Sequence, residues 1–233
     1  MSQPVLLIRQ QGLCDYQQTW QAMRDFTATR SSDTLSELWI VQHPPVFTQG
    51  QAGKAEHILD PGNIPVIQTD RGGQVTYHGP GQMVLYLLLS LYEIDLGVRA
   101  LVSAIEQAII DLLADYQLTA HTQLGAPGVY IGTAKIAALG LRIRRAYSYH
   151  GLALNVDMDL EPFQRINPCG YADLAVTQMR DHGIQTDIQQ VTDELIAHLC
   201  TKLGYQALLF SAKGSPSNQS LIATVRPYIQ PLP

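Results

Sequence analysis

Apolar and polar residues follow two different spacings along the chain, which together predict a protein that contains both strands and helices. Mostly apolar runs occupy residues 5–9, 38–42 and 83–89, and each is typical of a short buried strand. Between residues 98 and 116, apolar residues return every three or four positions while most acidic residues lie off that stripe, as in an amphipathic helix. The same spacing predicts another helix that begins near Tyr16.

The second half of the chain adds more strands than helices. Glycines separate strand-like segments at residues 128–131, 135–145 and 148–156. A further helix is predicted over residues 193–202, with Thr192 as its N-cap and acidic residues in its first turn. Because strands do not alternate regularly with helices, we expect an α/β protein of the α+β kind, a mixed β-sheet flanked by helices, rather than a doubly wound parallel sheet.

The composition indicates a folded protein of a reducing compartment. Of the 233 residues, 46% are apolar and 15% are charged, so the chain can form a sizeable core. The formal net charge of −5 argues against nucleic acid as a partner, because neutralising phosphates requires a basic surface. Three cysteines, Cys14, Cys169 and Cys200, are too few and too scattered for a disulfide framework.

Neither the first residues nor the longest apolar run has the pattern of a membrane-directed segment. The N-terminus lacks a basic stretch followed by an apolar one, so no signal peptide is recognised. The longest apolar stretch, residues 83–92, is much shorter than the ~20 residues that span a bilayer. We therefore expect a cytoplasmic protein that does not contact a membrane.

Residues 43–81 are dense in glycine and proline, which indicates a backbone that turns tightly or that a ligand approaches closely. Within this segment the paired glycines Gly72 and Gly73 lie near the polar side chains of Arg71 and His78. No phosphate-binding glycine motif occurs there. A lone histidine such as His78 is more often a hydrogen-bonded structural residue than a catalyst, and the sequence leaves both roles open.

Cys169 lies in the sequence Asn167-Pro168-Cys169-Gly170, which predicts a turn that presents its thiol. Backbone N–H groups of such a turn could stabilise a thiolate or an oxyanion. A buried thiol that only packs fits the same four residues. The other two cysteines lie in or beside predicted amphipathic helices and are interpreted as structural, and no cysteine pair or cysteine–histidine cluster indicates a metal site.

Lys135 opens an apolar segment, residues 135–141, that contains small side chains. Burial of a lysine favours its neutral amine, which can then act as a base. An ordinary lysine whose stem packs while its head reaches water fits the same pattern. A nearby basic run, Arg142, Arg144 and Arg145, suits either an acidic partner or a solvated edge strand.

Six blocks of distinctive sequence follow one another over residues 43–180. They are HPPVFTQG at residues 43–50, RGGQVTYHGPGQ at 71–82, GAPGVY at 125–130, KIAALG at 135–140, HGLALN at 150–155 and INPCG at 166–170. Together, in this order, they resemble the lipoyl(octanoyl) transferase family, the octanoyltransferases of lipoate biosynthesis. Several multi-residue blocks in register are far more specific than any one of them.

The resemblance implies the mixed α/β fold of biotin and lipoate protein ligases, as one catalytic domain over residues 1–211 followed by an irregular C-terminal tail over residues 212–233. It implies that octanoyl passes from octanoyl-acyl carrier protein to a lysine of a lipoyl domain or of the glycine-cleavage carrier protein. The acyl group arrives on the phosphopantetheine of the donor, so neither a cofactor nor a metal of the enzyme's own is expected. The resemblance is also compatible with a monomer.

The resemblance further implies the residues of the site. Cys169 and Lys135 match the family's catalytic pair: Lys135 accepts the thiol proton, and the thiolate takes up octanoyl as a thioester. Small residues at the acyl contacts suggest a groove in which a medium chain gains roughly 5 kcal/mol, at ~0.8 kcal/mol per methylene. The acyl contacts are expected at Arg71, Gly72, Gly73, Gln74, Val75, Thr76, Tyr77, His78, Ala138, Leu139, Gly140, Gly151, Leu152 and Ala153.

Other functions fit parts of the sequence. An ATP-dependent lipoate or biotin protein ligase shares the expected fold but has no need for a nucleophilic cysteine, and a cysteine amidotransferase would differ in its octanoyl donor. An inactive carrier-binding module would not need both Lys135 and Cys169. A cysteine hydrolase usually pairs its thiol with a histidine and a carboxylate, and His78 and His150 are the histidines open to that role.

Overall fold

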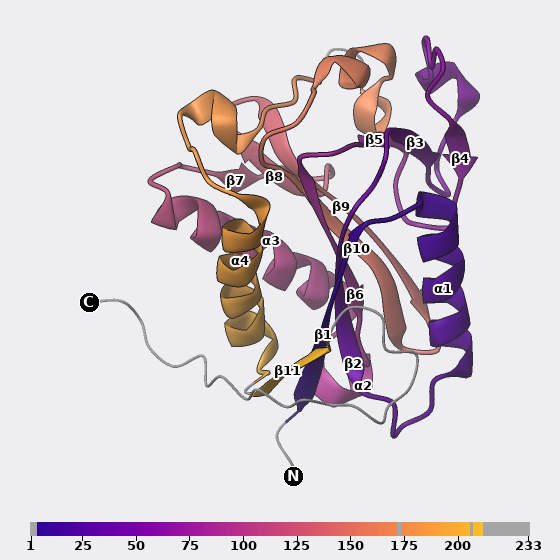
Figure 1. The fold of residues 1–233 in the computed structure, drawn as a ribbon, viewed down its shortest axis with the longest axis vertical. Coiled ribbons are helices and arrows are strands. Elements are labelled where there is room, and N and C mark those ends of the chain that lie inside the picture. The colour runs from indigo at the N-terminus through magenta and orange to yellow at the C-terminus, as the bar shows by residue number, and fades with distance from the viewer. Residues whose placement is uncertain (1–3, 172–173, 206, 212–233) are drawn as a thin grey trace.

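A large mixed sheet with helices on both faces dominates the computed structural model, which describes residues 4–171, 174–205 and 207–211 (Figure 1). The predicted fold class is confirmed, and the predicted irregular tail, residues 212–233, lies outside the described residues. The eight strands of this sheet are, in spatial order, β11 (Ala207–Ser211), β1 (Val5–Leu13), β2 (Ser36–Gln42), β6 (Gln82–Leu88), β10 (Tyr147–Asn155), β9 (Ala134–Arg144), β8 (Gly128–Ile131) and β7 (His121–Thr122).

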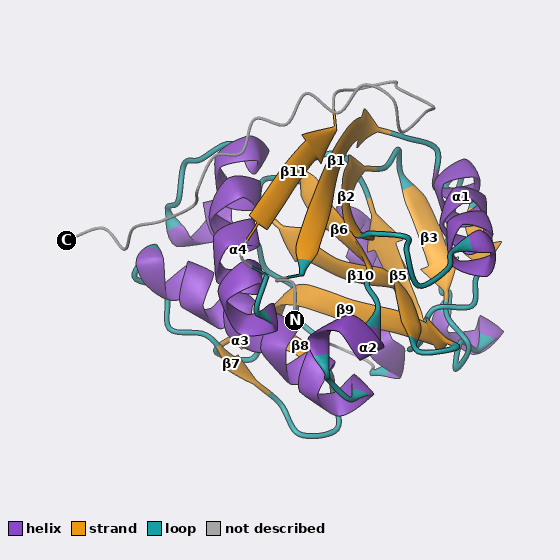
Figure 2. Cartoon of the chain, turned by 90° about the horizontal axis from the view of Figure 1, so that it is seen from below, coloured by secondary structure: helices purple, strands orange, loops and turns teal. Residues whose placement is uncertain are grey.

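One helix covers one face of the large sheet, and two helices cover the other (Figure 2). The helices are α1 (Tyr16–Thr29), α2 (Leu91–Ile94), α3 (Val98–Asp115) and α4 (Ile188–Leu203). Along the central strand β6, Met83 and Leu85 pack toward α3 and α4, whereas Val84 and Tyr86 pack toward α1. Because both of its faces are covered, β6 is apolar from Met83 to Leu88, which is the pattern that predicted it.

The long helix α3 confirms its predicted amphipathic stripe. Leu101, Ile105, Ile109 and Leu112 are all fully buried against the sheet. Complete burial of each such side chain contributes about 1.5–3 kcal/mol, so α3 is firmly held in place. None of the described helices is both long enough and apolar enough to cross a membrane.

The last helix, α4, begins at Ile188, so the predicted N-cap is wrong. Asp187 is the N-cap, and its carboxylate accepts a hydrogen bond from the backbone N–H of Gln190 at 2.7 Å. Thr192 is buried inside the helix, where its hydroxyl donates to the Ile188 carbonyl at 2.6 Å. A threonine followed by acidic residues resembles a helix start, but here it continues a helix whose buried face already includes Val191.

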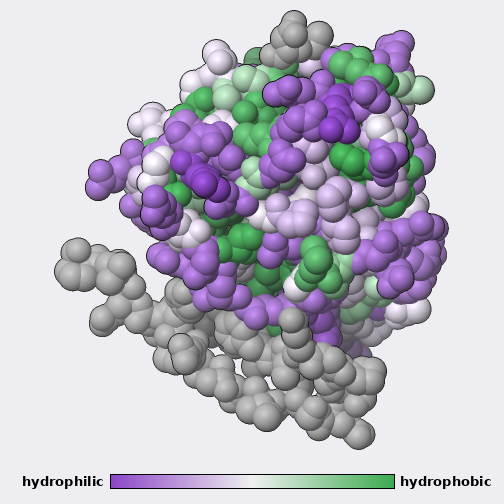
Figure 3. Space-filling view, turned by 45° about the horizontal axis from the view of Figure 1, so that its top comes forward, coloured by the Kyte–Doolittle hydropathy of each residue, from purple (hydrophilic) through white to green (hydrophobic). Residues whose placement is uncertain are grey.

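The glycine-rich segment forms a second, three-stranded sheet near one end of the large one (Figure 1). In spatial order its strands are β4 (Val66–Gln68), β3 (Val46–Gln49) and β5 (Val75–His78). Its apolar cluster brings Phe47 and Tyr77 against Phe163. Four short 3-10 helices complete the described structure: η1 (Ala55–His57), η2 (Glu161–Arg165), η3 (Pro168–Gly170) and η4 (Met179–His182). Viewed with this end brought forward, the surface shows small apolar patches among polar side chains (Figure 3).

Candidate active site

A pocket is lined by both sheets and by the first residue of α1. All of the predicted acyl contacts except Gly72 and Tyr77 line it. Tyr77 instead belongs to the apolar cluster of the small sheet, where its ring packs on Phe47 and Phe163. The lining residues are Tyr16, Arg71, Gly73, Gln74, Val75, Thr76, His78, Val84, Tyr86, Ala138, Leu139, Gly140, His150, Gly151, Leu152 and Ala153.

Two glycines allow the glycine loop to lie directly on the edge of β9. The backbone N–H of Gly72 donates to the Leu141 carbonyl at 3.1 Å. Leu141 lies beyond Ala138, the last residue of β9 in this direction that pairs with β8. A Cβ on Gly140 would lie 3.0 Å from the Gly72 carbonyl oxygen, and a Cβ on Gly72 would lie 3.1 Å from that of Leu141. Gly72 therefore shapes the pocket through its backbone, although it does not line the pocket.

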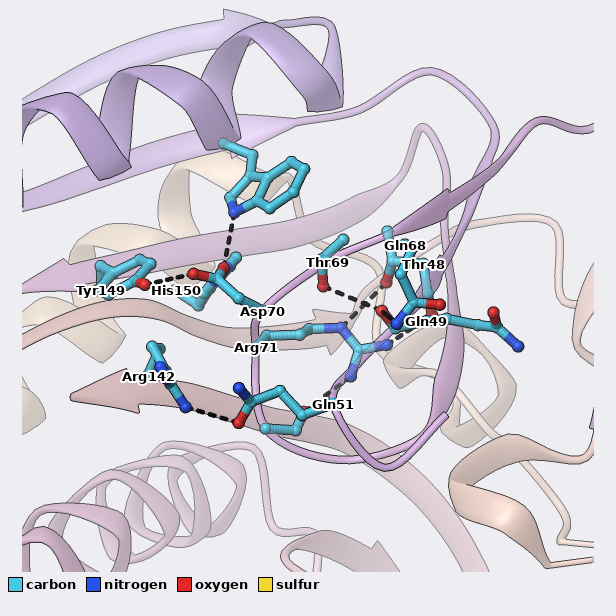
Figure 4. Close-up of polar contacts among 12 residues, drawn as sticks. Thr48, Gln49, Gln51, Gln68, Thr69, Asp70, Arg71, Arg142, Tyr149 and His150 are labelled. Atoms are coloured by element: carbon cyan, nitrogen blue, oxygen red, sulfur yellow. Dashed lines mark hydrogen bonds and ion pairs between the residues drawn. The ribbon is translucent and has the colours of Figure 1, made fainter. Parts of the chain in front are cut away.

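The buried guanidinium of Arg71 holds the glycine loop in shape (Figure 4). Its Nη2 donates to the carbonyls of Thr48 and Gln74, both at 2.6 Å, and its Nη1 donates to the Gly72 carbonyl at 2.9 Å. Its Nε donates to the Thr48 hydroxyl at 3.1 Å. Hydrogen bonds from a charged donor are about twice as strong as neutral ones, so Arg71 ties β3 to the loop that lines the pocket.

His78 is a buried, neutral histidine with a hydrogen bond at each ring nitrogen. Its Nδ1–H donates to Gln82 Oε1 at 2.7 Å, because the Gln82 amide group donates to Asn155 Oδ1 at 2.9 Å. Its Nε2 lies 3.4 Å from the Thr48 hydroxyl. Burial lowers the pKa of His78 to about 3. This geometry favours the structural role for His78, since a base that acts near neutral pH needs a much higher pKa.

The same chain of hydrogen bonds extends to the backbone of Lys135. The side chain of Asn155 donates to the Thr177 carbonyl at 2.9 Å, and the N–H of Thr177 donates to the Lys135 carbonyl at 3.0 Å. The N–H of Lys135 in turn donates to the Ala175 carbonyl at 2.8 Å. The pocket-lining His78 and the backbone of Lys135 therefore belong to one continuous network.

Behind the pocket, the carboxylate of Asp70 accepts hydrogen bonds from three side chains (Figure 4). Trp20 Nε1 lies 2.7 Å from Oδ1, His150 Nε2 lies 2.9 Å from the same oxygen, and the Tyr149 hydroxyl donates to Oδ2. Burial alone would raise the pKa of Asp70, but the bonds from His150, Tyr149 and Trp20 outweigh it and lower the pKa. Asp70 is therefore ionised at neutral pH.

His150 is neutral despite its acidic partner, because burial lowers its pKa more than Asp70 raises it. With Nε2–H donating to Asp70, the buried Nδ1 is a bare acceptor and has no hydrogen-bond partner among the described residues. His150 lines the pocket and has a φ of +58°, an unfavourable angle for a residue other than glycine. The sequence indicated His150 as the first residue of the HGLALN block and as a histidine open to a hydrolase role, whereas nothing in the sequence singled out Asp70.

Two tyrosines that the sequence pattern presented as core residues also line the pocket. Tyr16 is the first residue of α1, and Tyr86 lies in the central strand β6. The Tyr86 hydroxyl is 2.7 Å from His43 Nε2, whose ring holds the Cys14 carbonyl through Nδ1 at 2.7 Å. Burial lowers the pKa of His43, so it too is neutral and its Nδ1–H is the donor. An apolar stripe cannot show which tyrosine borders a cavity.

The side chain of Lys135 is buried, with 4% of the residue exposed. Its Nζ donates to the Pro127 carbonyl at 3.0 Å and lies 5.1 Å from the centroid of the Tyr130 ring. The pairing of β8 with β9 shifts register beside it, which leaves Ile136 as an extra residue, and such bulges commonly redirect a side chain near an active site. This burial contradicts the alternative of a lysine whose head reaches water.

The turn that carries Cys169 is the short 3-10 helix η3, as the sequence predicted. Its Gly170 has a φ of +77°, and the N–H of Asn167 donates to the His57 carbonyl at 2.8 Å. A Cβ on Gly170 would lie 3.2 Å from Gln74 Cδ, so the turn packs directly on a residue of the pocket. The thiol predicted to be the nucleophile lies outside the described part of the structure.

The other two cysteines have the surroundings of structural residues. Cys200 is buried in α4, and burial raises its pKa to about 12. The Cys14 thiol donates to the Gln11 carbonyl at 3.3 Å. The described residues contain no group of three or more histidines, cysteines and carboxylates that could hold a metal ion.

The fold that holds this pocket is that of the lipoate and biotin protein ligases, as comparison with solved structures shows. The bipartite lipoate protein ligase of Thermoplasma acidophilum, described with its E2 lipoyl domain, has a TM-score of 0.68 at 18% identity, covering 91% of this chain and 86% of that one. The biotin protein ligase of Aquifex aeolicus, in complex with biotin and ATP, has a TM-score of 0.54 at 11% identity, covering 84% and 69%. At these low sequence identities, the structural similarity establishes the fold alone.

The Lipoyl protein ligase A/B catalytic domain family matches residues 15–200, and the chain belongs to this family. Within it, the octanoyltransferase of Stutzerimonas stutzeri (strain A1501) is 63% identical over 198 residues, which are 85% of this chain and 90% of that protein. The resemblance noted in the sequence and the predicted class of enzyme, an acyltransferase, are confirmed.

Proposed function

We propose that this enzyme transfers an octanoyl group from octanoyl-acyl carrier protein to a lysine of a lipoyl domain, through a thioester on Cys169. The arrangement of three parts carries the proposal. The Cys169 turn packs on Gln74 at the pocket. Gly128 pairs with the pocket residue Ala138 and lies against the amine of Lys135. A cysteine-bearing turn thus packs on a residue of the small-residue pocket, and a buried amine lies against the glycine that pairs with another of its lining residues. Curated relatives are octanoyltransferases.

In the first half-reaction Lys135 accepts the proton of the Cys169 thiol. The thiolate attacks the octanoyl carbonyl, so the new sulfur–carbon bond forms as the bond to the phosphopantetheine sulfur breaks. The ammonium of Lys135 then returns its proton to the departing thiolate of the carrier. One thioester replaces another, so the step is close to isoenergetic and needs no ATP.

In the second half-reaction the amine of the acceptor lysine attacks the octanoyl-Cys169 thioester. A carbon–nitrogen bond forms, the carbon–sulfur bond breaks, and Lys135 takes the proton that the amine loses and returns it to the departing Cys169 thiolate, which restores the starting thiol and neutral amine. An amide is more stable than a thioester, so this half runs downhill and makes the whole transfer effectively one-way. Proton transfer by a positioned group of this kind typically contributes 10²–10⁴-fold to the rate.

The floor of the pocket suits an unbranched acyl chain. Two cross-strand pairs of β9 and β10, Ala138 with Ala153 and Gly140 with Gly151, place no large side chain on it. A Cβ on Gly151 would lie 2.0 Å from the Leu85 carbonyl oxygen, so this position tolerates glycine alone. At ~0.8 kcal/mol per buried methylene, a chain that fills the pocket is strongly favoured over acetyl.

The proposed partners follow from this chemistry. The donor is octanoyl-acyl carrier protein, whose phosphopantetheine delivers the thioester, and the acceptors are lipoyl domains and the glycine-cleavage carrier protein. A structural neighbour, the T. acidophilum ligase, is described with its own E2 lipoyl domain. We further propose that the enzyme acts in the cytoplasm as a monomer without a cofactor of its own.

Intact-mass measurement after incubation with octanoyl-acyl carrier protein tests the proposal. The wild-type chain should gain one octanoyl group without ATP, and Cys169→Ala should gain none. Lys135→Ala should acylate 10²–10⁴-fold more slowly, because it lacks the proton acceptor. Addition of apo-lipoyl domain should discharge the wild-type adduct and add octanoyl to the domain.

Cys200→Ala is the matched control, because that thiol is buried in α4 and should not change acylation. An adduct that survives Cys169→Ala, or a transfer that requires ATP, would contradict the proposal. An acylation rate unchanged in Lys135→Ala would remove Lys135 from the mechanism.

A further inference from the structure

The peptide group between Pro127 and Gly128 is hydrogen-bonded on both of its sides. Its N–H, from Gly128, donates to Glu106 Oε1 at 2.9 Å. Its carbonyl, from Pro127, accepts from Lys135 Nζ at 3.0 Å. One peptide group therefore connects a carboxylate on α3 to the buried amine on β9.

We infer that Glu106 is a positioning residue for the amine of Lys135 and acts on it through this single peptide group. The inference rests on the role proposed above for Lys135 in octanoyl transfer. Glu106 does not line the pocket and lies outside every block of sequence that resembles the octanoyltransferases.

Glu106 is well placed to hold a peptide still. It lies on α3 directly after Ile105, which is fully buried, and close to the fully buried Ala108 and Ile109. A hydrogen bond to a carboxylate is about twice as strong as a neutral one. Because hydrogen bonds in a chain polarise one another, the bond at the N–H also makes the Pro127 carbonyl a better acceptor for the amine.

Gly128 allows the 127–128 peptide to lie in direct contact with the side chain of Lys135. Its φ of +137° is a backbone angle that residues with a side chain rarely adopt, and a Cβ there would lie 2.6 Å from the Ala137 carbonyl oxygen. The same Cβ would lie 3.0 Å from Lys135 Cε and 3.2 Å from Nζ. A rotation of the 127–128 peptide therefore moves the group against which the amine rests.

A second contact fixes the residue before this peptide. The Tyr130 hydroxyl donates to the Ala126 carbonyl at 3.0 Å, and its ring lies beneath the Lys135 amine. With Ala126 held from β8, loss of the Glu106 hydrogen bond frees the 127–128 peptide to rotate without unfolding the loop. The expected effect is therefore confined to the position of the amine.

A displaced amine should slow the chemistry and leave donor binding intact. A proton acceptor must lie within hydrogen-bond reach of the thiol and of the incoming amine, and a displacement of about 1 Å can cost 10²-fold in rate. The acyl pocket contains neither Glu106 nor the 127–128 peptide. We therefore expect kcat to fall while KM for octanoyl-acyl carrier protein stays within about twofold of the wild-type value.

Three substitutions separate the hydrogen bond of Glu106 from its charge. Glu106→Gln keeps an oxygen at the same reach and should retain kcat within about threefold. Glu106→Asp keeps the charge but is one methylene shorter, and Glu106→Ala removes both. These two should each lose at least tenfold in kcat. All are assayed by octanoyl transfer to apo-lipoyl domain at temperatures where circular dichroism shows them folded.

Asp115→Asn is the matched control, since it neutralises a carboxylate at the C-terminal end of α3 that pairs with His198 and should leave kcat unchanged. A Glu106→Ala enzyme within twofold of wild type would overturn the inference, as would equal losses in the Gln and Asp variants. A wild-type chain that octanoyl-acyl carrier protein does not acylate would instead refute the proposed function.

Discussion

At the scale of single residues, the polar side chains that line the pocket form hydrogen bonds with other buried groups of the protein. The sequence singled out Arg71 and His78, but it could not show that Arg71 binds loop carbonyls or that His78 is neutral. Such roles depend on burial and on partners far away in the chain, such as Asn155 for His78 through Gln82. Motifs identify which residues matter, and only the fold decides what they contact.

Asp70→Asn should lower the free energy of unfolding and loosen the hydrogen bonds that hold His150 in the pocket lining. Asparagine offers one acceptor oxygen to three donors, so the buried Nε2–H of His150 or the hydroxyl of Tyr149 loses its partner. The expected loss in the free energy of unfolding is about 1–2 kcal/mol at pH 7, toward the low end because the Asp70 side chain is 29% exposed. Urea unfolding followed by circular dichroism measures it.

Tyr149→Phe is the control for that measurement, because it removes one donor and leaves the carboxylate bound to Trp20 and His150. Its cost should be smaller, about 0.5–1 kcal/mol. A loss in Asp70→Asn no greater than in Tyr149→Phe would show that the charge of Asp70 contributes little.

At the scale of elements, the sequence predicted those whose pattern is local and strong. The amphipathic stripe of α3 and the apolar run of β6 were both recognised, since each follows directly from which faces are buried. The small sheet of β3, β4 and β5 was not predicted, because its strands are only three or four residues long, lie between glycine-rich turns and show no clear alternation. Strand pairing between distant segments leaves no periodic signal in a single sequence.

The N-caps of α1 and α4 should differ in what they do for function. Asp15 and Asp187 each accept a hydrogen bond from a backbone N–H in the first turn, and replacing either by alanine should cost about 1 kcal/mol. Only α1 starts at the pocket, with Tyr16 in the lining. Asp15→Ala should therefore also raise KM for the octanoyl donor, whereas Asp187→Ala should leave kinetics unchanged.

Thermal unfolding and steady-state kinetics on both variants provide the comparison. Equal effects on KM would mean that the first turn of α1 does not position Tyr16.

Over the whole molecule, three buried histidines make stability depend on pH. Burial lowers the pKa of His43, His78 and His150, so each is neutral in the native state, whereas a histidine in the unfolded chain takes up a proton near pH 6.5. Below that pH the unfolded chain binds more protons than the native one, so stability falls as pH falls. Between pH 7.5 and 5.5 His78, with its pKa of about 3, should by itself account for slightly over 1 kcal/mol of this loss, and His43 and His150 add to it in the same direction.

Urea unfolding at the two pH values measures this loss. A stability that stays constant between pH 7.5 and 5.5 would mean that these histidines are protonated as readily in the native state as in the unfolded chain.

The order of strands also sets when the protein can finish folding on the ribosome. β1 pairs on one edge with β2, which is made soon after it, but its other edge pairs with β11, about 200 positions later in the chain. At ~5–20 residues per second, β1 waits about 10–40 s with its outer row of backbone groups unpaired. Such an edge can pair with a neighbouring nascent chain, so crowded polysomes are where this fold is most exposed to misassembly.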